Sequence, residues 1–192
     1  TSAPKVAKGF LKASMEDDPM GYTVALGLPA LRQRIAELYK TWYNFDLSPE
    51  RVVITPGSSG GFILAFSSLF DTRARVGIGA PGYPSYRQIL KSLDLVPVDL
   101  PTSLAARLQP TADDFKALDL QGLLVASPAN PSGTMLDRAA LSALIDATHA
   151  KGAAFISDEI YHGIEYDKKA VSALEISDDC YVINSFSKYF SM

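Results

Sequence analysis

The sequence predicts an α/β fold in which helices cover both faces of a doubly wound, mostly parallel β-sheet. Short apolar segments alternate with helical patterns along the chain, and most of these segments are continuously apolar rather than alternating. A continuous apolar run is typical of a strand that is covered on both faces. The predicted strands are Val52–Thr55, Arg75–Ala80, Leu95–Leu100, Gly122–Ser127, Ala153–Asp158 and Tyr181–Phe186.

Two segments between these strands carry apolar residues at the spacing of one helix face. In the first, which Pro29 opens, they are Leu31, Ile35, Leu38 and Trp42. In the second they are Leu141, Leu144, Ile145 and Thr148. Asp137 is the expected N-cap of the second helix, and Gly152 follows its end. Because Gly61–Phe70 is apolar all round, we expect a buried helix there.

Composition narrows the class of protein. The 192 residues suit one domain or most of one, and the 47% apolar and 20% charged residues are typical of globular proteins. A net charge of −3 without a long charged run favours neither a nucleic acid nor a membrane as partner. Cys180 is the only cysteine, which excludes an intramolecular disulfide and fits a reducing compartment. We therefore expect a cytoplasmic protein.

The turn after the first predicted strand has the composition of an anion-binding site. Pro56-Gly57-Ser58-Ser59-Gly60-Gly61 precedes a predicted helix there. Small residues let backbone N–H groups and hydroxyls approach an anion, and a helix N-terminus favours negative charge. The turn therefore predicts phosphate binding, with an ordinary strand–helix turn as the alternative.

Two further motifs match the sequence, and a third is absent. Gly57–Gly61 also fits the G-x-S-x-G nucleophile elbow of hydrolases. That elbow normally follows several earlier strands, however, and no HGGG-type segment is present. Gly77–Gly82 matches the spacing of the dinucleotide fingerprint, but its glycines lie mostly inside a strand and Pro84 follows too soon. A P-loop is excluded because Gly-Lys-Ser/Thr does not occur.

Three later strands end in residues that can do chemistry. Asn130 lies in a turn stiffened by prolines, Asp158 ends the fifth strand and Lys188 follows the sixth. Ligands of doubly wound sheets bind beyond the carboxyl ends of the strands. Taken singly, each residue also has an ordinary structural interpretation, as a loop amide, a solvated strand end or an exposed lysine.

Taken together, six motifs resemble the aspartate-aminotransferase-like family of fold-type-I pyridoxal-phosphate enzymes, the class I/II aminotransferases. They stand in the family's order between Tyr22 and Met192. They are Tyr22 with Gly27-Leu28-Pro29-Ala30-Leu31-Arg32, Gly57-Ser58-Ser59, Pro81-Gly82-Tyr83, Asn130-Pro131-Ser132-Gly133, Asp158-Glu159-Ile160-Tyr161 and Ser185-Phe186-Ser187-Lys188. The resemblance implies a three-layer α/β/α large domain over residues 31–192, preceded by an N-terminal segment over residues 1–30.

The resemblance implies pyridoxal phosphate as cofactor, no metal, and catalytic roles for three residues. Lys188 would bind the cofactor covalently and then act as the base that moves the α proton. Asp158 would pair with the pyridine nitrogen and keep it protonated. Tyr161, together with Asn130, would hydrogen-bond the phenolic oxygen of the cofactor.

Further contacts with the cofactor follow from the same resemblance. Tyr83 would stack on the ring, and Tyr22 would reach the phosphate bound by a second copy of the chain, which implies a homodimer with shared sites. The phosphate would be held by Gly57, Ser58, Ser59 and Ser185. His149 and His162 match no family position, and we assign them to structure. Cis peptide bonds are expected before Pro131 and Pro81.

The resemblance also implies parts that this sequence does not contain. In the family a further strand, a small domain and the arginine that binds the substrate carboxylate follow the position of Met192, so we expect an incomplete large domain. The resemblance predicts an aminotransferase acting on an amino acid and a 2-oxo acid. A lyase or synthase on the same scaffold, such as a carbon–sulfur lyase, and a non-catalytic sensor domain remain open, as does the identity of the amino acid.

Overall fold

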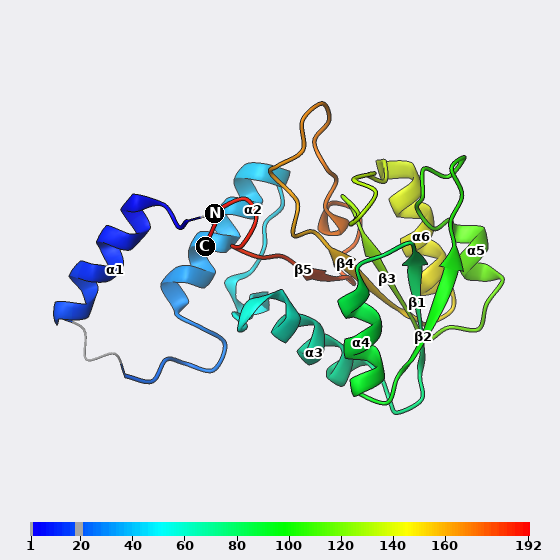
Figure 1. Ribbon diagram of the computed structural model, residues 1–192, viewed down its shortest axis with the longest axis horizontal. Helices are drawn as coiled ribbons and strands as arrows, with labels where there is room; N and C mark the ends of the chain where they lie inside the picture. Colours follow the sequence, from blue (N-terminus) through cyan, green and yellow to red (C-terminus); the bar gives the residue numbers. More distant parts are fainter. Residues whose placement is uncertain (1, 18–20) are drawn as a thin grey trace.

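The computed structural model describes residues 2–17 and 21–192, and its centre is a five-stranded sheet with helices on both faces (Figure 1). The strand order is β2-β1-β3-β4-β5, and every neighbouring pair is parallel. Because β2 and β3 flank β1 on opposite sides, the chain reverses its winding direction there, as in doubly wound sheets. The strands are β1 Arg75–Ala80, β2 Val96–Pro101, β3 Gly122–Ala126, β4 Ala154–Asp158 and β5 Tyr181–Ile183.

Four of the helices form two layers around this sheet. Successive residues of β3 and β4 point to opposite faces, so Leu123 and Phe155 pack in one core cluster whereas Leu124 and Ile156 pack in another. Helices α5 and α6 complete the first cluster, and α3 and α4 complete the second. The predicted α/β/α architecture is therefore confirmed. The helical elements are α1 Lys5–Asp17, α2 Pro29–Tyr43, η1 Pro49–Arg51, α3 Gly57–Leu69, α4 Pro84–Ser92, α5 Ala112–Lys116, α6 Arg138–Ala150 and η2 Ala173–Glu175.

The predicted strands are confirmed except for the first. Arg75–Ala80 is reproduced residue for residue, and the others differ by up to three residues at their ends. Val52–Thr55 is wrong as a strand, because within the described residues it joins no ladder. Among the described residues, the segment makes one backbone hydrogen bond to a distant part of the chain, from the Ile54 N–H to the Leu26 carbonyl at 3.0 Å. A β-branched pattern favours an extended chain, but a strand also needs a hydrogen-bonded neighbour.

Helix α6 confirms its predicted face and both of its predicted ends. Its buried side includes Leu141, Leu144, Ile145 and Thr148. The Asp137 carboxylate accepts the Ala140 N–H at 2.8 Å, which satisfies one of the free donors of the first turn. Gly152 lies just past the last turn with φ +65°, a conformation that side chains disfavour.

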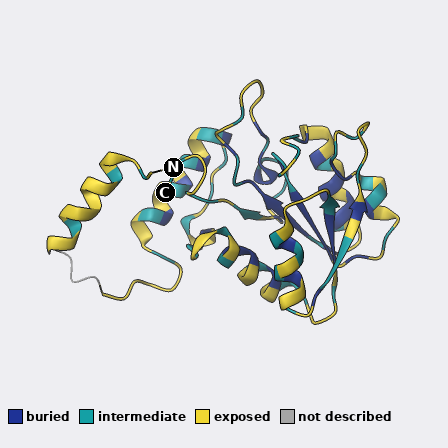
Figure 2. Cartoon of the chain, viewed as in Figure 1, coloured by how far each residue is buried: buried dark blue, intermediate teal, exposed yellow. Residues whose placement is uncertain are grey.

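The predicted faces of two other helices are corrected. In α2 the predicted stripe is only half-buried, and the fully buried stripe lies one residue further on, at Arg32, Ala36, Tyr39 and Tyr43. This rotation lets the Arg32 Nε donate to the Pro49 carbonyl at 3.0 Å. Helix α3 is not buried all round. Phe62 and Phe66 pack in the core cluster on the sheet, whereas Ile63 and Leu64 are 46% and 48% exposed. The helix shows both buried and exposed residues in Figure 2.

Helix α1 lies to one side of the sheet and exposes nearly its whole length (Figures 1 and 2). Its exposed apolar side chains are Val6, Phe10, Leu11 and Met15. Across residues 2–17 and 21–192, none of the helices is long and apolar enough to span a membrane. Both predicted cis peptide bonds, Asn130–Pro131 and Ala80–Pro81, are confirmed, and Ser127–Pro128 is a third.

Candidate active site

Asp158 is the last residue of β4 and lies beside Ala126 of β3, at the carboxyl edge of the sheet. Its side chain is buried, the residue being 2% exposed. One carboxylate oxygen accepts the Ile160 N–H at 3.1 Å, and the other accepts the hydroxyl of Tyr86. Burial raises the pKa of Asp158 to about 6, although both hydrogen bonds act in the opposite direction. A buried acid of this kind at a strand end is best stabilised by a cationic partner.

Tyr86 is a site residue that the sequence analysis missed. It lies in the first turn of α4, three residues after Tyr83, and its ring packs edge-on against that of Tyr83 at a centroid distance of 5.4 Å. Burial and the neighbouring Asp158 raise the pKa of Tyr86, so its hydroxyl keeps the proton that it donates to Asp158. Because residues three apart share a helix face, the Tyr-x-x-Tyr spacing was the signal that could have found it.

Asn130, Tyr161 and Lys188 come together from the loops that follow three neighbouring strands. The Asn130 Nδ2 group donates to the Tyr161 hydroxyl at 3.4 Å. The Lys188 Nζ atom lies 5.5 Å from the centroid of the Tyr161 ring. The turn that carries Asn130 is closed by an Ala129 N–H to Thr134 carbonyl bond of 2.9 Å. An amine, a phenol and an amide are therefore gathered at the same edge as Asp158.

Three of the four predicted phosphate-binding residues, Gly57, Ser58 and Ser59, form the first turn of α3. Gly57 has φ +70°, and no atom lies within 4 Å of the position that a β-carbon would take. Among the described residues no side chain caps this helix, so its first N–H groups can bind an anion. The helix packs against β5, since a β-carbon on Gly61 would lie 3.4 Å from the Ile183 Cδ1 atom. Ser58 and Ser59 thus lie near the strand that leads to Ser185 and Lys188.

Ser185 and Tyr22 have different surroundings. The Ser185 Oγ atom accepts the Ser187 N–H at 3.1 Å and lies 2.7 Å from the Ser187 hydroxyl, which orders the turn before Lys188. Tyr22 is fully exposed and is not brought to the other site residues within this chain. Tyr83 is 40% exposed.

A buried polar network adjoins Asp158 and includes the next residue in the chain, Glu159. His162 joins the Tyr43 hydroxyl through Nδ1 at 2.7 Å and the Ser127 carbonyl through Nε2 at 2.8 Å. The Glu159 Oε1 atom accepts the Ala173 N–H at 2.8 Å, while its Oε2 atom lies 3.6 Å from the His162 ring. Burial raises the pKa of Glu159. The network ties α2 to the ends of β3 and β4, and sequence spacing gave no signal for it.

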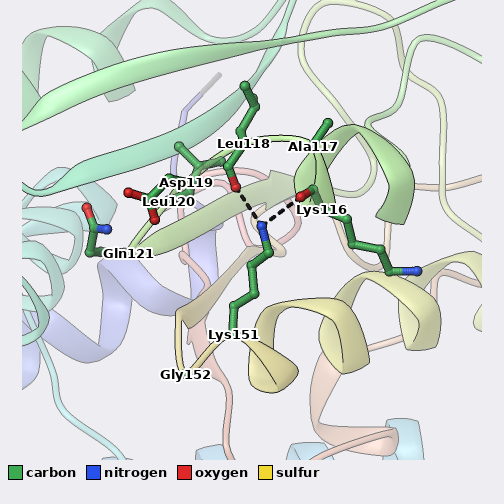
Figure 3. Close-up of a pocket in the computed structure, with 8 residues that line it drawn as sticks. All are labelled: Lys116, Ala117, Leu118, Asp119, Leu120, Gln121, Lys151 and Gly152. Atoms are coloured by element: carbon green, nitrogen blue, oxygen red, sulfur yellow. Dashed lines mark hydrogen bonds between the residues drawn. The ribbon is translucent and has the colours of Figure 1, made fainter.

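One hollow in the described part of the chain is remote from these groups. It measures about 480 Å³ and lies where the chain enters β3 and β4, at the amino edge of the sheet (Figure 3). The Lys151 ammonium fills one side of it and donates to the carbonyls of Lys116 and Leu118 at 2.7 Å each. A smaller cavity of about 20 Å³ lies at the carboxyl edge, beside Tyr86, Gln109 and Asn130.

Comparison with known proteins gives a consistent picture. Residues 2–192 match the family model described as aminotransferase class I and II. The valine–pyruvate aminotransferase of Mycobacterium tuberculosis is 42% identical over 99% of this chain, and the (5-formylfuran-3-yl)methyl phosphate transaminase of Methanocaldococcus jannaschii is 33% identical over 100% of it. The chain spans about half the length of these curated relatives, 50% of each.

Solved structures agree with the curated relatives. The crystal structure of an aminotransferase from Mycobacterium tuberculosis superposes with a TM-score of 0.96 at 42% identity, covering 100% of this chain and 54% of that one. A crystal structure from Silicibacter pomeroyi superposes with a TM-score of 0.93 at 68% identity, covering 100% of this chain and 49% of that one. Both share the sheet that carries the candidate site.

Proposed function

Because the chain belongs to the class I and II aminotransferase family, whose cofactor is pyridoxal phosphate, we propose that the protein transfers an amino group between an amino acid and a 2-oxo acid. One observation carries the proposal. An amine, a buried carboxylate and an amide–phenol pair lie at the same edge of the sheet, on Lys188, Asp158, Asn130 and Tyr161.

These residues fit the cofactor by their chemistry. The uncapped first turn of α3 suits a phosphate, and Gly57 leaves open space beside it. Asp158 is a buried acid that a protonated ring nitrogen would neutralise. Asn130 and Tyr161 offer hydrogen-bond donors for an anionic oxygen. When bound, pyridoxal phosphate supplies an electron-withdrawing ring that stabilises negative charge on the reacting carbon of the substrate.

Each residue then has a definite task. Lys188 would hold the cofactor and, once released, would take the α proton of the amino acid on its Nζ atom and deliver it to the cofactor carbon to which Nζ had been attached. Asp158, in its ionised form, holds a proton on the group facing it, and the Tyr86 hydroxyl fixes the direction of the carboxylate. Tyr161 and Asn130 stabilise negative charge by donating hydrogen bonds.

The test is an amino-transfer assay on the full-length protein supplied with pyridoxal phosphate. Valine and pyruvate are the first pair to try, because the relative at 42% identity is named for them. We expect product only when an amino acid and a 2-oxo acid are both present, with alternating release of the two products. Aspartate and alanine as donors, and 2-oxoglutarate as acceptor, define the selectivity. Release of ammonia and an oxo acid without any acceptor would instead indicate a lyase and contradict the proposal.

The proposal includes a homodimer in which Tyr22 of one copy contacts the phosphate held by the other. It is supported by the full exposure of Tyr22 and by the exposed apolar side of α1, since apolar patches of this kind favour association. Phe10 is 77% exposed and apolar, so Phe10→Asp should shift the full-length protein from dimer to monomer in size-exclusion chromatography with light scattering. Lys12→Asp changes charge on the same helix without removing apolar surface and serves as control. A dimer that survives Phe10→Asp unchanged would exclude α1 from the interface.

A further inference from the structure

Gln109 joins two carbonyl groups at the edge of the sheet that carries Asp158. Its side chain is buried, the residue being 3% exposed. The Nε2 group donates to the Ala126 carbonyl at 3.1 Å and to the Thr134 carbonyl at 2.9 Å. Ala126 is the last residue of β3, and Thr134 closes the turn that contains Asn130. One amide therefore bridges the two ends of the segment that carries Asn130.

The backbone before Gln109 adopts an uncommon conformation. Arg107 and Leu108 have φ angles of +54° and +57°, so two consecutive residues with side chains lie in the left-handed region. Residues other than glycine rarely adopt this region, and two in succession are disfavoured. Such a conformation persists only where the surrounding contacts fix it. The Gln109 amide and its two carbonyl partners are contacts of this kind.

The Gln109 amide and the carbonyls of Ala126 and Thr134, here called the clamp, lie beside the residues of the proposed site. The Thr134 carbonyl also accepts the Ala129 N–H at 2.9 Å, so Gln109 holds the closing bond of the Asn130 turn. Ala126 lies directly opposite Asp158 in the parallel register. Gln109 also lines the cavity of about 20 Å³ that Tyr86 and Asn130 share. The amide thus connects the supports of two proposed cofactor ligands, Asn130 and Asp158.

We propose that Gln109 is a positioning residue that fixes the turn of Asn130 relative to β3, and so aims the Asn130 amide at the anionic oxygen of the cofactor. The inference rests on the proposed function. A purely stabilising Gln109 would act independently of Asn130, whereas a positioning Gln109 acts through Asn130. Two residues that act through one another give non-additive effects when both are replaced.

The test is a double-substitution cycle in the full-length protein with Gln109→Met and Asn130→Ala. Methionine keeps the length of the side chain and removes both donors. The measurements are the dissociation constant of pyridoxal phosphate and the pH midpoint of its visible absorption band when bound. We expect Gln109→Met to weaken cofactor binding about five- to tenfold and to move the midpoint in the same direction as Asn130→Ala. Adding Gln109→Met to Asn130→Ala should then change neither quantity further.

Gln121 provides a matched control. Its side chain accepts the Arg75 N–H at 2.9 Å, at the amino edge of the sheet, where it also borders the remote hollow (Figure 3). Gln121→Met therefore removes a side-chain amide contact at an exposed residue far from the proposed site, and it should leave both cofactor measurements unchanged. Gln109→Glu is a second variant of nearly the same size. Its carboxyl group donates only when protonated, so its defect should deepen as the pH rises.

The outcomes separate the inference from the proposed function. If Gln109→Met lowers only the melting temperature, or if its effects add to those of Asn130→Ala, Gln109 does not act through Asn130 and the inference is overturned. If the unaltered protein binds no cofactor, the proposed function fails. The side-chain amide NMR signals of Asn130 in the cofactor-free protein then still test the clamp. Gln109→Met should shift or broaden these signals and Gln121→Met should not, and unaffected signals would refute the clamp.

Discussion

Replacing Lys188 with alanine should abolish covalent binding of the cofactor and lower amino transfer by about 10⁴-fold or more. The amine at this position lies 5.5 Å from the Tyr161 ring, at the edge of the sheet where Asp158 ends β4. An alanine cannot form a carbon–nitrogen bond to the cofactor, and it cannot carry the α proton. The first turn of α3, which we propose to bind the phosphate, remains, so the variant should still bind pyridoxal phosphate reversibly.

The measurement is borohydride reduction of the holoenzyme followed by peptide mapping. In the unaltered protein the label should fall on Lys188, and Lys188→Ala should carry none. Lys151→Ala is the matched control, because the Lys151 ammonium is bound to two carbonyls at the opposite edge of the sheet. A label on Lys151, or on the exposed Lys168, would overturn the assignment of Lys188.

Asp158→Asn should lose activity far more than it loses cofactor. The amide is close to the carboxylate in size and can still accept the Tyr86 hydroxyl, but it has no charge with which to keep a proton on the group that faces it. Loss of such an electrostatic contact at a reacting centre lowers turnover about 10²- to 10³-fold. We expect cofactor affinity to fall much less, because the contacts from α3 are unchanged. Equal losses of turnover and affinity would contradict this role.

The same variant has a second, cofactor-free readout. Burial raises the pKa of Asp158 from 3.8 to about 6, so the folded state binds this proton more readily than the unfolded state does. Stability is therefore lost as the pH rises from about 4 to about 6, and the loss reaches about 3 kcal/mol above that window, at about 1.4 kcal/mol for each pKa unit. Asp158→Asn removes this penalty.

Urea unfolding of the cofactor-free full-length protein checks this effect. Asp158→Asn should be more stable than the unaltered protein at pH 8, and the difference should vanish near pH 4. Asp146→Asn makes the same change of charge at an exposed position of α6 and should show no such pH dependence. A gain in stability that is equal at both pH values would mean that the ionisation of Asp158 is not its cause.

The sequence by itself determined the features that depend on residues close together in the chain. A mostly apolar run predicted β1 residue for residue, because a strand covered on both faces carries apolar residues on both of them. The face and both ends of α6 followed from 3.6-residue periodicity and from the capping preferences of Asp137 and Gly152. The order of the motifs also indicated the family, since each motif is a short local segment.

The tertiary structure decided what depends on contacts between distant segments. Val52–Thr55 has the composition of a strand but lacks a neighbouring ladder among the described residues, and hydrogen-bonded pairing cannot be read from one segment alone. The buried face of α2 is the one that bonds Arg32 to Pro49 and packs Tyr39 and Tyr43 with Leu174, and the most apolar stripe does not reveal these distant contacts. The exposed side of α3 is as apolar as its buried side, so periodicity could not distinguish them.

The side chains that orient the proposed site residues also depend on contacts between distant segments. Tyr86 donates to Asp158 from 72 residues away, and Gln109 reaches across 25 residues to Thr134. Tyrosine and glutamine occur throughout a globular chain, so their presence in a sequence does not mark a site. Once buried, they must be hydrogen-bonded, because an unpaired polar group in the interior is costly, and these bonds then fix the groups that they contact. The sequence thus predicted which residues would perform the proposed chemistry. The packing of α4 and of the segment before Gln109 decided which other side chains orient them.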